Sequence, residues 1–106
     1  MKAMKICADG ATAVIELPNV LEAFQQAVGG YIETVTLADK TVMIVDEEGR
    51  LRGKPRNAKA SAISNLDIVG DALVCGVAED EFTDIPEGVL GLLEQWFRKG
   101  GRFDVD

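Results

Sequence analysis

Residues 41–45 read Thr-Val-Met-Ile-Val, and the fold follows largely from them. Apolar side chains occupy both alternating positions, so a β-strand formed here would be buried on both faces. A strand of that kind belongs in the middle of a sheet. Residues 31–37 before it are rich in β-branched and aromatic side chains and predict a neighbouring strand, joined through the short connection 38–40.

Further strands are expected on either side of this pair. Residues 2–8 and 13–17 predict a hairpin around Gly10. After a turn at 46–49, in which Gly49 would take a positive φ, residues 50–52 predict a short return strand with Leu51 pointing inward. Residues 68–75 predict a strand pair or one bulged strand, and 79–84 an acidic loop.

Two helices are predicted, over 20–28 and 85–99, where apolar residues recur at helical spacing. We expect Asn19 to cap the first helix and Gly29 to end it, and Asp84 with Glu87 to form a capping box for the second. Residues 58–66 predict one or two helical turns, since alanines favour a helix there while Ser61 weakens it.

The predicted fold class is α+β, with a mainly antiparallel β-sheet and two α-helices packed on one face or end. The connections between neighbouring strands are too short for the crossovers that parallel strands need. The chain has 106 residues, and residues 1–106 are expected to form a single domain. Residues 100–106 are expected to be a frayed tail or an edge strand.

Composition excludes several kinds of chemistry. The chain has 18 acidic and 11 basic residues and no histidine, so His-based dyads and His-containing metal sites are ruled out. The acidic stretches 46–48 and 79–84 lack the pattern of a calcium loop. We therefore predict no catalytic residue, no metal ligand and no cofactor, and a protein that is not an enzyme.

Cys7 and Cys75 stand far apart and outside any C-x-x-C motif. Both lie in apolar, strand-like runs and are expected to be buried free thiols, although a disulfide or a reactive thiol stays open. No apolar run is long enough for a signal peptide or a membrane span. These features predict a cytoplasmic protein with no membrane partner.

A basic segment is the main candidate for a binding site. Five of the 11 Lys and Arg residues fall within positions 50–59, which contain no acidic residue. Guanidinium groups and exposed loop amides suit phosphate or carboxylate oxygens. The expected ligand-binding residues are Arg50, Arg52, Lys54, Arg56, Asn57 and Lys59. The alternative is a solvated edge, whose arginines pair with Glu47, Glu48 and other acids nearby.

Three runs of sequence resemble a family catalogued as domain of unknown function 3846. They are Val-Gly-Gly-Tyr-Ile-Glu at 28–33, Asp-Glu-Glu-Gly-Arg-Leu at 46–51 followed by Gly53, Pro55, Asn57 and Ala58, and Ile-Val-Gly at 68–70 followed by Ala72, Leu73, Val74 and Gly76. The similarity spans most of residues 1–97. It implies a short protein of bacteria, their phages or mobile elements, and it implies no activity and no catalytic residue.

Together these features predict a non-enzymatic binding module that captures an anionic, nucleotide-like small molecule or a host protein. Direct nucleic-acid binding is disfavoured by the net charge of −7. An alternative is an acidic inhibitor or DNA mimic that occupies a host defence protein through its carboxylates. A homo-oligomer stays open, because Gly88 and Gly91 on the helix 85–99 would allow a second chain to approach closely.

Overall fold

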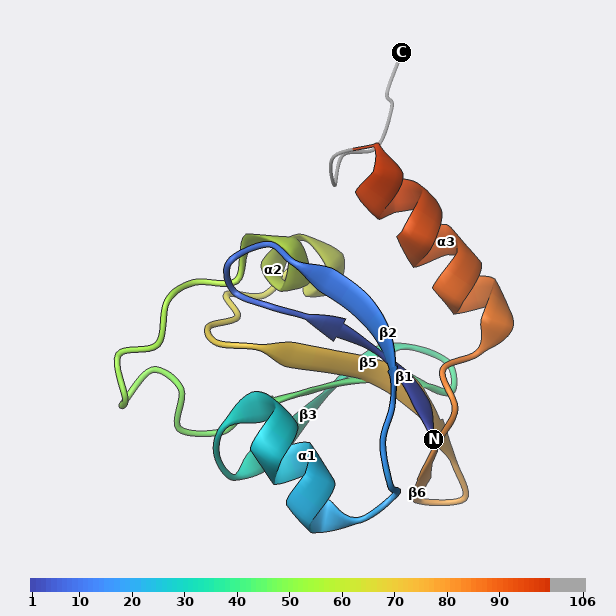
Figure 1. Cartoon of the computed structure of the whole chain (residues 1–106), viewed down its shortest axis with the longest axis horizontal. Helices are drawn as coiled ribbons and strands as arrows, with labels where there is room; N and C mark the ends of the chain where they lie inside the picture. The colour runs from blue at the N-terminus through green and yellow to red at the C-terminus, as the bar shows by residue number, and fades with distance from the viewer. Residues whose placement is uncertain (100–106) are drawn as a thin grey trace.

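The structure is a computed structural model that describes residues 1–99, and its centre is an antiparallel β-sheet. The strands lie in the order β2-β1-β5-β4-β3, and β6 pairs with β5 outside this path (Figure 1). Every paired strand is antiparallel, as the short connections predicted. The strands are β1 (Lys2–Ile6), β2 (Thr12–Glu16), β3 (Ile32–Ala38), β4 (Thr41–Asp46), β5 (Ala72–Ala78) and β6 (Glu81–Thr83).

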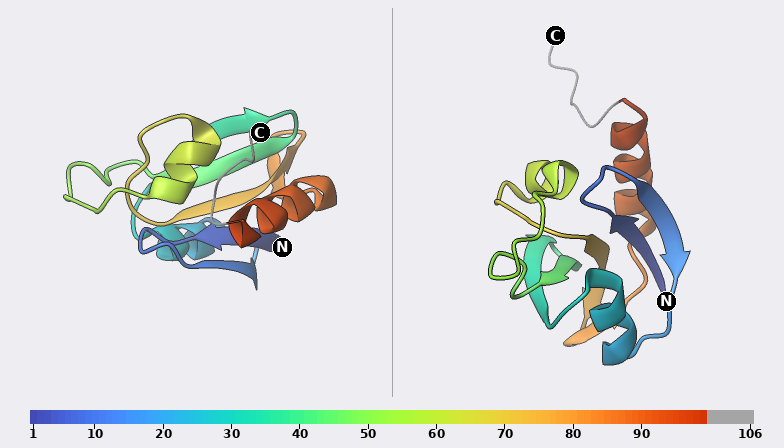
Figure 2. Two further views of the ribbon diagram at one scale, coloured as in Figure 1. Left: turned by 90° about the horizontal axis from the view of Figure 1, so that it is seen from above. Right: turned by 60° about the vertical axis from the view of Figure 1, so that its left-hand side comes forward.

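The sheet is covered by helices on both faces. In α1 (Leu21–Val28), Phe24 and Val28 pack on one face against a cluster that includes Ile44 and Leu73. On the other face, α2 (Ala58–Ser64) and α3 (Glu87–Arg98) contribute to a second cluster that includes Met43 and Val45. Figure 2 shows α1 and α2 on opposite sides of the sheet.

The α+β class and the antiparallel sheet are confirmed, but the expected number and placement of the helices are wrong. Within residues 1–99, three helices cover two faces, where two helices on one face or end were expected. The reason lies in β4, whose residues are all buried. A strand that is apolar on both sides needs a cover on each side, because exposing either face to water would cost most of its hydrophobic stabilisation.

The segment 50–52 forms no strand. Its backbone is held in a tight local turn, in which the Arg52 N–H donates to the Glu48 carbonyl and the Gly53 N–H to that of Arg50, each over 3.1 Å. Leu51, expected to point inward, is 85 % exposed. Gly49 does not take a positive φ either; it is needed because a Cβ there would lie 2.8 Å from Cγ2 of Val69.

Both expected N-terminal caps are also wrong, because tertiary contacts take the capping side chains. Asn19 donates from Nδ2 to the Phe82 carbonyl, and Asp84 accepts from the Lys2 N–H over 2.9 Å. The helices α1 and α3 begin after Val20 and Pro86, with no side-chain cap. The C-terminal cap of α1 is confirmed, since Gly29 has a φ of 80°.

Other predictions have mixed outcomes. The hairpin of β1 and β2 and the helical turns at 58–66 are confirmed. Instead of an acidic loop, the chain at 79–84 turns back as β6. Cys75 is buried and Cys7 partly buried, and both are free thiols. The expected tail or edge strand at 100–106 lies outside the described residues. Among residues 1–99 no helix is both long and apolar enough to span a membrane.

Candidate anion-binding site

The six expected ligand-binding residues lie in four different surroundings. Arg50 and Arg56 come together on the carboxylate of Asp67. Arg52 and Lys54 point instead to the C-terminal end of α1, through hydrogen bonds to its last carbonyl groups. The other two, Asn57 and Lys59, make separate contacts at either side of α2. The structure therefore brings two of the six together at the surface as a pair.

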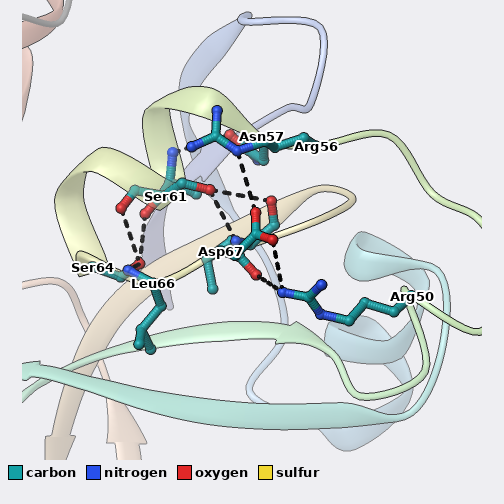
Figure 3. A network of polar contacts seen from close by, with 9 residues as sticks. Arg50, Arg56, Asn57, Ser61, Ser64, Leu66 and Asp67 are labelled. Carbon is teal, nitrogen blue, oxygen red and sulfur yellow. Dashed lines mark hydrogen bonds and ion pairs between the residues drawn. The ribbon is translucent and has the colours of Figure 1, made fainter.

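Asp67 holds the two guanidinium groups of that pair (Figure 3). Nη2 of Arg50 lies 3.0 Å from Oδ2 of Asp67 and donates to the Asp67 carbonyl over 2.8 Å. Nε of Arg56 donates to Oδ1 over 3.2 Å. The hydrogen bond and charge of Arg50, then those of Arg56, lower the pKa of Asp67 below its ordinary value. Asp67 is thus ionised near neutral pH, and both arginines face solvent, 65 % and 63 % exposed.

Backbone hydrogen bonds hold the segment that follows Asp67 beside the segment that carries Arg56. α2 ends at Ser64, its C-cap Asn65 takes the left-handed conformation, and the chain then turns back alongside residues 55–57. The Asn57 N–H donates to the Ile68 carbonyl and the Gly70 N–H to that of Pro55, each over 2.8 Å. Ser61 accepts the Ile68 N–H on its hydroxyl oxygen over 2.9 Å. The Arg50–Asp67–Arg56 cluster therefore rests on a hydrogen-bonded frame.

Asn57, expected to orient a ligand, lies wholly inside the fold and organises this frame. Its Nδ2 donates to the carbonyls of Ile6 and Gly70, each over 2.9 Å. Its Oδ1 accepts the Ala60 N–H over 3.0 Å and so caps α2. The Asn57 side chain is buried and its amide is hydrogen-bonded within the fold, so it does not contact a ligand that binds at the surface.

Lys54 is likewise tied to the fold. Its Nζ pairs with the fully buried carboxylate of Asp46 and donates to the Val28 carbonyl over 2.8 Å. Burial alone would raise the pKa of Asp46, but the hydrogen bonds from Lys54 and from the Glu48 N–H outweigh it and lower the pKa. Arg52 donates to the Gly29 carbonyl over 2.9 Å from the surface.

Lys59 connects α2 to its neighbours. Its Nζ donates to the Gly10 carbonyl over 2.6 Å and lies 5.2 Å from the centre of the Phe97 ring. These contacts use the ammonium group to join the β1–β2 turn, α2 and α3. Lys59 therefore lies apart from the Arg50–Asp67–Arg56 cluster.

A cavity of about 340 Å³ opens beside Arg50 and Asp67. It lies between the ends of β3 and β4 and the segment 66–69. Its apolar lining includes Val35, Val45 and Ile68. The Arg50 guanidinium thus stands at the edge of a hollow that could hold part of a ligand.

The exposed guanidinium groups of the cluster have the chemistry needed to bind an anion. Guanidinium groups that are fixed in place but exposed can donate hydrogen bonds to the oxygens of a carboxylate or phosphate. Among residues 1–99 no group of three or more acidic or cysteine side chains is placed to hold a metal ion. Burial raises the pKa of Cys75 to about 11, so this thiol stays protonated and unreactive near neutral pH.

The ion pair of an arginine with Glu48, part of the alternative expected from the sequence, is present, with Nη2 of Arg52 3.5 Å from Oε1 of Glu48. Sequence reasoning missed Asp67 as the partner of Arg50 and Arg56. Asp67 follows Arg50 by 17 positions and Arg56 by 11, and no local pattern connects residues at such separations. The role of Asn57 as the N-cap of α2 could have been predicted, because an asparagine directly before an alanine-rich helix is a typical N-cap.

Comparison with known proteins gives one match. A family model described as "Domain of unknown function (DUF3846)" matches residues 1–98. No curated protein and no solved structure matches the chain. The matched span includes Arg50, Arg56 and Asp67, so the cluster lies within the part of the chain that the family model covers.

Proposed function

The chain belongs to the family described as domain of unknown function DUF3846, and we propose that it is a non-enzymatic binding module that holds an anionic ligand between Arg50 and Arg56. The observation that carries this proposal is the convergence of both guanidinium groups on the one carboxylate of Asp67. A carboxylate on a ligand would accept hydrogen bonds from the same two guanidinium groups. Asp67 supports the proposal as an internal anion that contacts both guanidinium groups.

Nitrogen atoms remain available for a ligand. Arg56 contacts Asp67 through Nε, and within residues 1–99 its two Nη atoms have no hydrogen-bond partner. Arg50 contacts Asp67 through Nη2 alone, which leaves Nε and Nη1 free within the same part of the chain. These free nitrogen atoms can donate hydrogen bonds to an anion while Asp67 keeps the two guanidinium groups in place.

Local charge supports a ligand with a single negative charge. Two arginines against one aspartate leave the cluster with one net positive charge. Because both arginines are well exposed, their attraction for an anion is weakened by salt. We therefore expect weak binding that is easiest to measure at low ionic strength.

The test compares the wild type with the double variant Arg50→Gln/Arg56→Gln by isothermal titration calorimetry. The probes are acetate and inorganic phosphate, with adenosine monophosphate for the nucleotide-like ligand expected from the sequence. Arg98→Gln is the matched control, because Arg98 is an exposed arginine on α3, outside the cluster. The proposal expects at least one probe to bind the wild type and the control but not the double variant.

Equal binding to all three proteins, or no binding of any probe, would contradict the proposal. The alternative of an acidic inhibitor that mimics nucleic acid makes a different prediction. Under that alternative, neutralising Arg50 and Arg56 leaves partner binding intact, while neutralising acidic residues such as Glu79 and Asp80 on the β5–β6 turn removes it.

A further inference from the structure

We infer that the cavity beside Arg50 binds a free α-amino acid with an apolar side chain. This inference rests on the proposed function and names the class of ligand that the site would take. In this arrangement the ligand's carboxylate meets the Arg50 guanidinium, its ammonium group meets acidic side chains at the cavity edge, and its side chain lies on the apolar lining.

The size and lining of the cavity suit a small ligand. A volume of about 340 Å³ is at the lower end of the range of roughly 300–1,000 Å³ found for small-molecule sites. The apolar part of the wall comes from Val35 and Val45 on neighbouring strands and from Ile68 and Val69 on the segment opposite. An aliphatic side chain placed between these residues would be removed from water on two sides, which is favourable.

The charged groups around the cavity point to a positive group on the ligand as well. The acidic residues that line the cavity with Arg50 are Glu33, Asp46, Glu47 and Asp67, of which Asp46 is paired with Lys54. Asp67 is occupied by the two arginines, whereas Glu33 and Glu47 have no ion pair within residues 1–99. Carboxylates without a cationic partner beside an apolar wall favour a ligand that supplies an ammonium group.

The same charges disfavour a nucleotide in this cavity. The lining of the cavity contains four acidic residues and one basic residue, Arg50, so a phosphate group with nearly two negative charges would meet net repulsion. A zwitterion avoids this, because its ammonium offsets the charge of its carboxylate. Size acts in the same direction, since a nucleotide is much larger than an amino acid. The cavity therefore selects a small zwitterion over the nucleotide-like ligand expected from the sequence.

The test uses leucine and two analogues that each lack one charged group. 4-Methylpentanoate keeps the carboxylate and loses the ammonium, and 3-methylbutylamine keeps the ammonium and loses the carboxylate. Binding to the full chain is followed by isothermal titration calorimetry at low ionic strength. We expect leucine to bind at least about tenfold more tightly than either analogue.

Variants assign each end of the ligand to its side chain. Glu33→Gln/Glu47→Gln should weaken leucine binding several-fold and leave 4-methylpentanoate unaffected or slightly improved. Arg50→Gln should weaken both. Glu94→Gln is the control for loss of an acidic charge, because Glu94 is exposed on α3 and does not line the cavity.

The outcomes separate this inference from the proposed function. If 4-methylpentanoate binds as tightly as leucine and Arg50→Gln removes both, the inference is overturned while the proposed anion site stands. If leucine binds but Arg50→Gln has no effect, the carboxylate does not meet Arg50 and the inference fails. If neither leucine nor an analogue binds, the inference is overturned whatever acetate or phosphate does.

Discussion

Nζ of Lys54 lies 2.5 Å from Oδ2 of Asp46, and this ion pair joins the end of β4 to the end of α1. The same Nζ donates to the carbonyls of Val28 and Gly29, over 2.8 and 3.1 Å. The carboxylate is completely buried, while the lysine side chain is 22 % exposed. The ion pair and these hydrogen bonds therefore anchor the basic segment 50–59 to the C-terminal end of α1.

Replacing Lys54 by methionine should strongly destabilise the fold. Loss of the ammonium leaves the buried carboxylate of Asp46 without a charged partner, and breaking a buried pair in this way costs about 3–5 kcal/mol. Urea denaturation of Lys54→Met measures the change in the free energy of unfolding. Lys40→Met, at an exposed lysine in the β3–β4 turn, is the control. A loss below about 1 kcal/mol would show that the pair is dispensable.

Stability should fall in acid through Asp46. Its pKa in the fold is below the ordinary value, so the ionised pair stabilises the fold above the unfolded-state pKa of about 3.9. That contribution is lost as the pH falls through the lower pKa of the folded state. The difference in free energy of unfolding between wild type and Asp46→Asn should therefore be constant near neutral pH and shrink below about pH 4. A difference that grows in acid would contradict this sign.

Gly30 should tolerate no side chain, again because of Asp46. A Cβ at Gly30 would lie 2.5 Å from Oδ1 of Asp46, well inside van der Waals contact. Gly30→Ala should displace the carboxylate from its pair and lower the thermal midpoint. At Gly91 on α3 nothing lies within 4 Å of a Cβ, so Gly91→Ala should stabilise the helix by about 0.5–1 kcal/mol. Equal effects of the two substitutions would argue against close packing at Gly30.

Asp67→Asn should strengthen anion binding at Arg50 and Arg56. The carboxylate of Asp67 repels an anion bound at the free nitrogen atoms of the two guanidinium groups, and the amide removes that charge. We expect the affinity for acetate to rise several-fold in calorimetric titrations at low salt. Unchanged affinity would mean that the charge of Asp67 does not act on the anion, and weaker binding would mean that this charge is required to position the arginines.

The sequence predicted the sheet well because its strands carry local patterns. The apolar run at 41–45 placed β4 in the sheet interior, and the structure buries all of it. The strand predicted at 50–52 is wrong. Arg-Leu-Arg alternates like a strand, but turn hydrogen bonds from the N–H groups of Arg52 and Gly53 set the shape of the backbone there. The caps expected from Asn19 and Asp84 failed because each side chain bonds to a residue distant in sequence.

The candidate site was predictable only in part. The density of positive charge at 50–59 is a local property, and it marked Arg50 and Arg56. Tertiary contacts decide which of these cations remain at the surface. Lys54 pairs with Asp46 beside α1, and Lys59 donates to the Gly10 carbonyl. The cavity is formed by segments that meet only in the folded chain, so no sequence pattern indicated that Glu33 and Glu47 line one cavity with Arg50.

The central claim is that Arg50 and Arg56 together hold an anion. The most direct measurement follows the arginine Nε–H signals of the ¹⁵N-labelled full chain by NMR during titration with acetate at constant ionic strength. We expect saturable shifts for Arg50 and Arg56 and for the amides of residues 66–69, with no saturable shift for Arg98. Shifts that never saturate, or that are the same for all three arginines, would contradict it.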